Sequence, residues 1–427
     1  MGQKPYAGVV SGRDGALYGT TLGGGSNCAG TVFKVNTDGS GYATLHAFVT
    51  NGVDGQSPGA LTQASDGALY GMTAIGGTNR AGTVYTLNVD GSGYRVLHVF
   101  GSVARDGGNP EAGLTEGSDG GLYGTTFFGG SNDLGTVFRL SKDGNSYGLL
   151  CHFGRPAGDG ANPAAAMVQG ADGALYGTTF FGGTNDAGTL FKLNTNGGGY
   201  SLLRMFTTNG LDGRNPDAAL MQASNGALYG TTYGGGASNA GTIFTLSTNG
   251  GGYNLLHSFR SFAGDAQSPL GALSEGKDGV LYGLTYSGGS NGVGAIFKLA
   301  RDGTNYSVWR GFLSSGGDGQ NPRGRLVLGS DGAFYGTTWN GGQSGAWTVF
   351  QIYPPETPDM LGAVESGNTA QVWFSGVSGY HYQVLRSTNL VDWAALGTVL
   401  MPVSAVSTNI DPAAPMAGAF YRAAWVP

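Results

Sequence analysis

Two aspartates of this sequence, Asp133 and Asp186, could form a catalytic pair. They occupy the same position in two consecutive repeats, where other repeats carry Cys28, Arg80 or Asn239. If the repeats fold as neighbouring sheets, the two carboxylates would lie about 10 Å apart, or less near a common axis. That spacing is close to the roughly 6.5–9.5 Å of an inverting glycosidase pair. The alternative is two solvated loop aspartates, because no second catalytic marker accompanies them.

Aromatic residues suggest a second kind of chemistry. They follow the Thr-Thr strand of five consecutive repeats, as Phe127-Phe128, Phe180-Phe181, Tyr233, Tyr286 and Trp339. Flat aromatic rings stack on the C–H faces of sugars, and the dispersion contacts add up along a groove. A buried ring would not need the hydroxyl or indole N–H of Tyr233, Tyr286 and Trp339, so we expect these three to reach the surface. The alternative is that the rings belong to the core. The predicted ligand-binding residues are Phe128, Phe181, Tyr233, Tyr286, Trp339 and Arg80.

The remaining polar candidates are weaker. Arg80 could bind a substrate carboxylate, or it could be an ordinary solvated arginine. His46, His98 and His257 come from different repeats and are too far apart to share a metal at about 2.1 Å. An Asp-Gly-x-Asn/Ser-Pro segment recurs in six copies, which favours a turn over a catalytic role. We therefore predict neither a metal nor a cofactor.

A sevenfold repeat positions these candidates. Its Asp-Gly hairpin signal, once Asn-Gly, recurs at residues 14, 66, 119, 172, 225, 278 and 331, with a first spacing of 52 and then 53. Each copy holds strand-like runs in a fixed order, at 59–62, 69–73, 83–87 and 94–100 in the second copy. The third run always has an aromatic residue followed by a polar one, as a half-buried strand requires. Four antiparallel strands repeated seven times predict an all-β fold, a seven-bladed β-propeller over residues 1–353.

The loops of a propeller alternate between its two faces. The short Asp-Gly hairpins and the third-to-fourth turns should share one face. The second-to-third loops and the connections between blades should share the other, which we call the variable face. We expect function there, because binding residues concentrate on loops held by a rigid scaffold. The seventh copy stops after its third run, so we expect three strands of its own in that blade.

The segment after the repeats has a different pattern. Residues 354–358, Pro-Pro-Glu-Thr-Pro, predict a stiff linker. Short strand-like runs at 370–374, 380–385 and 419–422 follow. They predict a small β-sandwich over residues 359–427.

Composition excludes several classes of protein. Of 427 residues 84 are glycine and 15 proline, and only 11% are charged against roughly 25% in ordinary domains. The net charge of −6, with no basic cluster, argues against nucleic acid and anionic membrane as partners. No apolar run reaches the 18 or so residues of a membrane helix, so we expect no membrane insertion. We also expect two free cysteines, Cys28 and Cys151, and no signal peptide at residues 1–4. The pattern says nothing of the oligomeric state.

The repeat resembles a known family. Segments such as 172–193, DGALYGTTFFGGTNDAGTLFKL, are similar to the GloVer tandem repeats of bacterial surface and secreted proteins. The tail, with Ser387-Thr388-Asn389 and Phe420-Tyr421-Arg422, resembles the β-sandwich that follows such repeats in secreted verrucomicrobial proteins. The resemblance implies export to the cell surface or the medium and supplies no catalytic motif.

Two functions remain open from the sequence. The first is an extracellular carbohydrate-recognition propeller that binds a neutral poly- or oligosaccharide on the aromatic residues of its variable face. The second is a polysaccharide hydrolase or lyase that uses Asp133 and Asp186. A catalytic site should break the sevenfold pattern with several polar residues in one place, whereas a lectin can keep one equivalent pocket in each blade.

Overall fold

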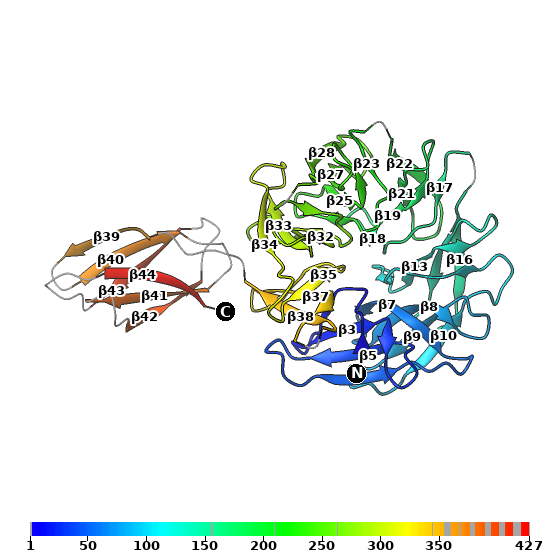
Figure 1. Ribbon diagram of the computed structural model, residues 1–427, viewed down its shortest axis with the longest axis horizontal. Coiled ribbons are helices and arrows are strands. Elements are labelled where there is room, and N and C mark those ends of the chain that lie inside the picture. The colour runs from blue at the N-terminus through cyan, green and yellow to red at the C-terminus, as the bar shows by residue number, and fades with distance from the viewer. Residues whose placement is uncertain are drawn as a thin grey trace. The chain divides into compact units, whose positions relative to one another are not determined.

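The computed structural model describes residues 2–154, 157–208, 210–262, 264–343, 345–353, 360–366, 369–375, 381–388, 394–400, 406–412 and 420–426. Every regular element among these residues is a strand. Seven sheets form a ring (Figure 1), which confirms the predicted seven-bladed propeller. The chain divides into two compact units, one with most of the propeller and one that includes residues 352–427. Among the described residues, no helix is long and apolar enough to cross a membrane.

Each complete blade has four antiparallel strands, with the fourth strand at the periphery of the ring (Figure 1). The first strands are β2 (Val10–Ser11), β7 (Gly55–Gln63), β12 (Thr115–Glu116), β18 (Val168–Gln169), β24 (Met221–Gln222), β30 (Ser274–Glu275) and β36 (Val327–Leu328). The second strands are β3 (Leu17–Thr21), β8 (Leu69–Gly76), β13 (Leu122–Thr126), β19 (Leu175–Thr179), β25 (Leu228–Thr232), β31 (Leu281–Thr285) and β37 (Phe334–Gly341). The third strands are β5 (Thr31–Val35), β9 (Thr83–Leu87), β15 (Thr136–Leu140), β21 (Thr189–Leu193), β27 (Thr242–Leu246), β33 (Ala295–Leu299) and β38 (Thr348–Ile352). The fourth strands are β6 (Ala43–Ala47), β10 (Arg95–Val99), β16 (Tyr147–His152), β22 (Ser201–Met205), β28 (Asn254–Ser258) and β34 (Ser307–Gly311).

A short second ribbon, which the sequence analysis did not predict, lies in each blade. In it the segment before the proline pairs with the glycines that follow the second strand. The pairs are β1 (Gly2–Gln3) with β4 (Gly23–Gly24), β11 (Gly107–Gly108) with β14 (Phe128–Gly129), β17 (Gly160–Ala161) with β20 (Phe181–Gly182), β23 (Gly213–Arg214) with β26 (Gly234–Gly235), and β29 (Ala266–Gln267) with β32 (Ser287–Gly288). In blade two the same pairing is part of β7 and β8, and in blade seven β35 (Gly319–Pro322) pairs with β37. These ribbons fix the connections between blades on the variable face.

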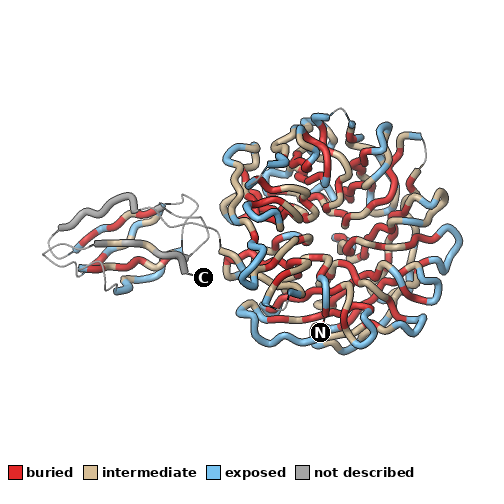
Figure 2. Tube along the Cα trace, viewed as in Figure 1, coloured by how far each residue is buried: buried red, intermediate tan, exposed pale blue. Residues whose placement is uncertain are grey.

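Burial follows the strands, and exposed residues gather at the loops (Figure 2). The glycine of each Tyr-Gly-Thr strand makes room for the aromatic ring of the third strand. At Gly124, for example, a β-carbon would lie 2.4 Å from the ring of Phe138. Neighbouring blades share their cores, because Tyr229 and Phe259 of blade five cluster with Phe297 of blade six. The repeated glycine is therefore a packing requirement of the blade.

Blade seven has the strands β36, β37 and β38, together with β35, and no described strand pairs with the outer edge of β38. The ring nevertheless closes against blade one. The hydroxyl of Thr337 donates to the carbonyl oxygen of Ala7 at 2.9 Å. The indole N–H of Trp347 donates to the carbonyl oxygen of Gly2, also at 2.9 Å.

The C-terminal unit contains two three-stranded antiparallel sheets. One has β39 (Met360–Ser366), β40 (Thr369–Ser375) and β43 (Val406–Asp411), and the other has β42 (Ala394–Leu400), β41 (His381–Ser387) and β44 (Phe420–Val426). The rings of Phe374 and Tyr382, one from each sheet, have centroids 6.2 Å apart. The sandwich and the domain boundaries stay predictions, and the expected linker at 354–358 lies outside the described residues.

Candidate functional site

Four polar residues, from blades one, three, five and seven, lie near the axis of the propeller. Each follows the proline that precedes the first strand, as Tyr6 in blade one, Glu111 in three, Asp217 in five and Arg323 in seven. Residues 6–10 are alternately half-buried and buried, so the side chain after the proline faces the axis rather than the blade core. The guanidinium of Arg323 lies over the ring of Tyr6, and the charges of Glu111, Asp217 and Arg323 all affect the pKa of Tyr6. We call them the axial cluster.

The backbone before the proline positions this cluster. The residue there is in the left-handed region in all seven blades, with φ between 52° and 58°, and in three of them it is an asparagine whose side chain reaches the blade before it. The amide of Asn321 donates to the carbonyl oxygen of Tyr286 at 2.9 Å, and Asn215 does the same to Phe180 at 3.0 Å. Asparagine tolerates this backbone conformation better than most residues. The residues before Pro216 and Pro322 thus tie Asp217 and Arg323 to the aromatic position of the preceding blade.

Arg323 lies among three aromatic rings. Its guanidinium carbon is 4.4 Å from the ring centroid of Tyr6, 5.2 Å from Trp339 and 5.7 Å from Tyr286. The rings of Tyr6 and Trp339 are edge-to-face at 6.2 Å, and Lys4 Nζ lies 5.7 Å from the ring of Trp339. Cation–π attraction stabilises a guanidinium over aromatic faces, and it therefore favours the position of Arg323 between these rings.

The pKa of each of the two carboxyls of the axial cluster is raised. Burial raises the pKa of Glu111, the nearby charge of Asp217 raises it further, and Arg323 lowers it. Burial likewise raises the pKa of Asp217 against the effect of Arg323, and burial raises the pKa of Tyr6 to about 12. No hydrogen bond or ion pair within 4.0 Å joins Glu111, Asp217 or Arg323 to another residue that the structure describes. Their polar atoms have unused bonding capacity.

A second arginine, Arg325, follows Arg323 in the chain. It is two residues beyond Arg323 on the same side of the chain, where the other complete segments have Gly8, Gly113, Ala166, Ala219 and Ala272. It is exposed, yet the protein around it lowers the pKa of its guanidinium by desolvation. Lys4 and Arg323, by contrast, both lie beside the ring of Trp339.

The predicted aromatic residues fall into two groups. Tyr286 and Trp339 are half-buried beside Arg323, and Tyr233, at the same position of blade five, is 43% exposed. Phe128 and Phe181 lie one residue later in their repeats and are 43% and 36% exposed. Phe128 and Phe181 begin the short strands β14 and β20, one residue after the position that Tyr286 and Trp339 occupy.

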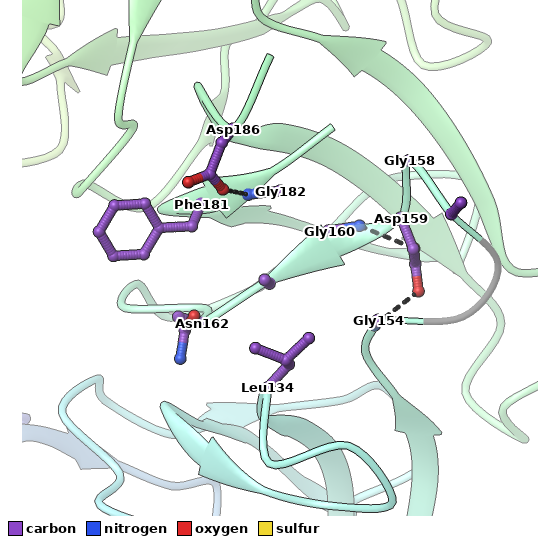
Figure 3. Close-up of a pocket in the computed structure, with 11 residues that line it drawn as sticks. Leu134, Gly154, Gly158, Asp159, Gly160, Asn162, Phe181, Gly182 and Asp186 are labelled. Atoms are coloured by element: carbon purple, nitrogen blue, oxygen red, sulfur yellow. Dashed lines mark hydrogen bonds between the residues drawn. The ribbon is translucent and has the colours of Figure 1, made fainter. Parts of the chain in front are cut away.

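Phe181 and Asp186 instead line a pocket of about 400 Å³ at the boundary between blades three and four. Leu134 of blade three and Asn162 of blade four contribute to its wall (Figure 3). Buried Asp159 accepts hydrogen bonds from the backbone N–H groups of Gly154 and Gly160 and so holds the neighbouring loop. The pocket brings two of the predicted site residues together, away from the axial cluster.

Asp133 and Asp186 each cap their own loop. Their Oδ1 atoms accept the backbone N–H of Gly129 and of Gly182 at 2.8 Å, and both residues have positive φ. Asn239 makes the same bond to Gly235 at 2.9 Å. Both aspartates are exposed, and one oxygen of each carboxylate has a structural partner. The catalytic pair stays a prediction.

Arg80 occupies the same position in blade two. It is exposed, has a φ of 58°, and donates its backbone N–H to the carbonyl oxygen of Gly77 at 3.1 Å. Its guanidinium has no hydrogen bond or ion pair to the described part of the chain. The structure places it in a loop of the variable face, apart from the axial cluster.

The recurring aspartates hold the blades together. Asp54 is buried and accepts hydrogen bonds from the backbone of Val49 and Gly55, from the ring of His46 at 3.3 Å, and from the hydroxyl of Tyr94. No group of three or more His, Cys, Asp or Glu side chains in the described ranges could hold a metal.

A family profile for the Gloeobacter/Verrucomicrobia repeat matches residues 1–171 and 166–380. The chain belongs to the Gloeobacter/Verrucomicrobia repeat family. No curated protein matches it in sequence. In structure it is similar to an oligogalacturonate lyase from Vibrio parahaemolyticus, at 10% identity and a TM-score of 0.54, over 83% of this chain and 90% of that one. It is also similar to an ulvan lyase bound to a GlcA–Rha3S saccharide, at 10% identity and a TM-score of 0.49, over 83% and 96%. These similarities show the fold alone.

Sequence reasoning missed the axial cluster of this Gloeobacter/Verrucomicrobia repeat protein. The residue after the recurring proline carried a sequence signal for this cluster. Its neighbours barely change between repeats, whereas it varies through Tyr6, Glu111, Ala164, Asp217, Leu270 and Arg323. Blade two lacks the position, since its copy is one residue shorter between Pro58 and Asp66. A variable polar position inside an otherwise constant segment was the available signal.

Proposed function

We propose that this protein binds a carbohydrate chain outside the cell, at the axial cluster on the variable face. Tyr6, Tyr286 and Trp339 supply the apolar ring faces on which sugars stack. Glu111, Asp217 and Arg323 supply acceptors and donors for sugar hydroxyls, and they have no hydrogen-bond or ion-pair partner in the described chain. The cluster breaks the sevenfold pattern with several polar residues in one place.

The charge at the axis favours an acidic sugar over the neutral one expected from the sequence. That expectation assumed a weakly charged aromatic platform, but Arg323 lies among these rings with Lys4 beside it. An arginine with a free planar fork is suited to a carboxylate or sulfate. The raised pKa of Glu111 and of Asp217 weakens their repulsion of such a group. The position of Arg323 carries this proposal.

We expect the aromatic residues at the axis to contribute strongly to binding. Tyr286→Ala and Trp339→Ala should each weaken the binding of an acidic oligosaccharide by about 1–3 kcal/mol, because each variant loses the stacking contacts of one ring. Titration calorimetry on a panel of uronate-containing and neutral oligosaccharides measures the loss. Phe262→Ala is the matched control, because this ring is 54% exposed and lies in a loop between blades, outside the cluster. Unchanged affinity of both variants, with melting temperatures intact, would reject the site.

Cleavage of the polysaccharide is the second candidate function. Its support is the pair of acids with raised pKa, Glu111 and Asp217, because general acids at work near neutral pH need such shifts. Assays for reducing ends and for unsaturated products decide first whether the wild-type protein cleaves any ligand that it binds.

Amide variants then separate the predicted pair, Asp133 and Asp186, from the two acids of the axial cluster. Asp133→Asn and Asp186→Asn should fold normally, because Asn239 already makes the same loop bond. If Asp133 and Asp186 are the catalytic pair, either change removes cleavage, by about two orders of magnitude or more. We expect Asp133→Asn and Asp186→Asn to leave cleavage unchanged. We expect Glu111→Gln and Asp217→Asn to remove it. The opposite result would place the catalytic residues in the loops that carry Asp133 and Asp186.

A further inference from the structure

The short ribbons of blades three and four differ from those of the other five blades at one cross-strand pair. In blade four the small residue Ala161 pairs with Phe181, and in blade three Gly108 pairs with Phe128. In the other blades a long polar side chain replaces the small residue, in the pairs Gln3–Gly23, Gln56–Ile75, Arg214–Gly234, Gln267–Ser287 and Gln320–Asn340. Blades three and four therefore present an apolar ring where the others present an amide or a guanidinium.

Blade five shows what the long polar side chain does. Nε of Arg214 donates to Oδ1 of Asn239 at 3.0 Å, and Asn239 occupies the loop position that Asp186 occupies in blade four. A β-carbon on Gly234 would lie 3.1 Å from that Nε, so the arginine fills the space in which Phe181 has its side chain. The loop residue of blade five thus receives a donor from its own ribbon.

Asp186 receives no such donor. Its Oδ1 accepts the backbone N–H of Gly182 at 2.8 Å, and the phenyl ring of Phe181 has no polar hydrogen to offer its Oδ2. Oδ2 has no hydrogen bond or ion pair to any other residue that the structure describes. Figure 3 shows the carboxylate and the ring of Phe181 on the same side of the ribbon. The exchange of residues leaves a charged acceptor beside an exposed aromatic ring.

The second free polar atom of this pocket is also an acceptor. Asn162 lines the pocket, and its Nδ2 donates to the carbonyl oxygen of Phe127 at 2.8 Å. Its Oδ1 accepts no hydrogen bond within the described chain. Among the described side chains that line the pocket, none has a free donor. A ligand must therefore supply the N–H or O–H groups, and the charge of Asp186 favours a cationic one.

We propose that this pocket binds a sugar residue that carries a protonated amine, as in a glucosamine oligosaccharide. The ammonium group donates to Oδ2 of Asp186, and the C–H face of the pyranose ring stacks on Phe181. A hydroxyl of the same sugar donates to Oδ1 of Asn162. A lysine side chain would meet the carboxylate, but it has neither a ring face for Phe181 nor a hydroxyl for Asn162. The volume of about 400 Å³ is that of a small-ligand site.

Three oligosaccharides of the same length and linkage test the proposal on the full chain. They are oligomers of glucosamine, of N-acetylglucosamine and of glucose, and only the first carries ammonium groups. Titration calorimetry at about pH 6, where such amines are protonated, should show the glucosamine oligomer to bind about tenfold more tightly than the other two. That ratio corresponds to one charge-assisted hydrogen bond.

Protein variants locate the binding. Asp186→Asn should remove the preference for the glucosamine oligomer, and it should fold normally because Asn239 makes the same loop bond. The double variant Ala161→Arg, Phe181→Gly copies the ribbon of blade five. It should weaken binding as much, because its own guanidinium then supplies the donor to Asp186. Asp90→Asn is the matched control, since it removes the same charge from an exposed turn between β9 and β10.

The results also separate this pocket from the axial cluster. Arg323→Ala should leave the affinity for the glucosamine oligomer unchanged, so this site stands or fails independently of the proposed function. Equal binding of the three oligomers overturns the proposal, as does an equal loss of affinity in Asp90→Asn and Asp186→Asn. A lysine trimer that bound more tightly than the glucosamine oligomer, and lost its affinity in Asp186→Asn, would also overturn it, because the ligand would then be a basic peptide.

Discussion

Replacement of Arg323 by alanine is expected to raise the dissociation constant of an acidic oligosaccharide about thirtyfold or more. A charge-assisted hydrogen bond contributes about 1.5–3 kcal/mol, and the variant loses that bond while the rings of Tyr6, Tyr286 and Trp339 stay in place. Arg323→Lys should recover only part of the affinity, because an ammonium group keeps the charge but not the planar fork. Calorimetry with the same saccharide measures both variants.

Arg80→Ala is the control for this result. Arg80 is also an exposed arginine of the variable face, and the sequence analysis predicted it as a ligand residue, yet it lies apart from the axial cluster. We expect the affinity of the Arg80→Ala variant for the saccharide to be unchanged. If Arg80→Ala lost affinity and Arg323→Ala did not, the binding site would be in the loop between the second and third strands of blade two.

The pH dependence of saccharide binding tests the same site through its carboxyl groups. Burial raises the pKa of Glu111 and of Asp217, so as the pH falls these carboxyls take up protons in a range above that of ordinary carboxyls. Each proton removes negative charge near Arg323. Binding of a sulfated saccharide, which keeps its charge at this pH, should tighten over that range. In the Asp217→Asn, Glu111→Gln double variant this dependence should disappear, and an unchanged dependence would place its origin elsewhere.

The propeller could be predicted from the sequence because each repeat contains the residues that specify its own strands and turns. Asp-Gly hairpins, an aromatic residue in every third strand and a glycine opposite it recur at fixed spacing, and each acts within one blade. Even the short seventh blade was predicted from its missing run. The extra ribbons were not predicted, because segments such as Gly23–Gly24 are too short and too rich in glycine to show a strand pattern.

The site was predicted only in part, for a geometric reason. Repeat periodicity identifies residues with equivalent surroundings, such as Tyr233, Tyr286 and Trp339. The axial cluster instead joins different residue types from blades one, three, five and seven, which meet only when the ring closes. The sequence analysis grouped Phe128 with Tyr286, although Phe128 lies one residue later in its repeat.

Closure of the ring rests on a backbone contact, and Gly324→Ala should break it. A β-carbon on Gly324 would lie 1.9 Å from the backbone nitrogen of Gly8 and 2.4 Å from its α-carbon. Neither atom can move aside as a flexible side chain would, so blades seven and one must separate. The nearby hydrogen bond from Thr337 to Ala7 would be lost with the contact. We expect the free energy of unfolding to fall by about 3 kcal/mol or more, as for a severe overpacking change.

Two further glycines show whether the closing contact differs from the others. Gly148→Ala meets no atom within 4 Å and its backbone conformation suits alanine, so its melting temperature should be unchanged or slightly raised. Gly271→Ala makes the same kind of clash one blade earlier, 2.3 Å from the carbonyl oxygen of Gly324. Blade six is held by a complete fourth strand, whereas blade seven is not. Thermal melts should therefore show Gly324→Ala to be the more damaging change, and its protein should lose protection from hydrogen exchange first in β36 to β38. If Gly324→Ala melted with Gly148→Ala, the backbone contact between blades seven and one would not hold the ring closed.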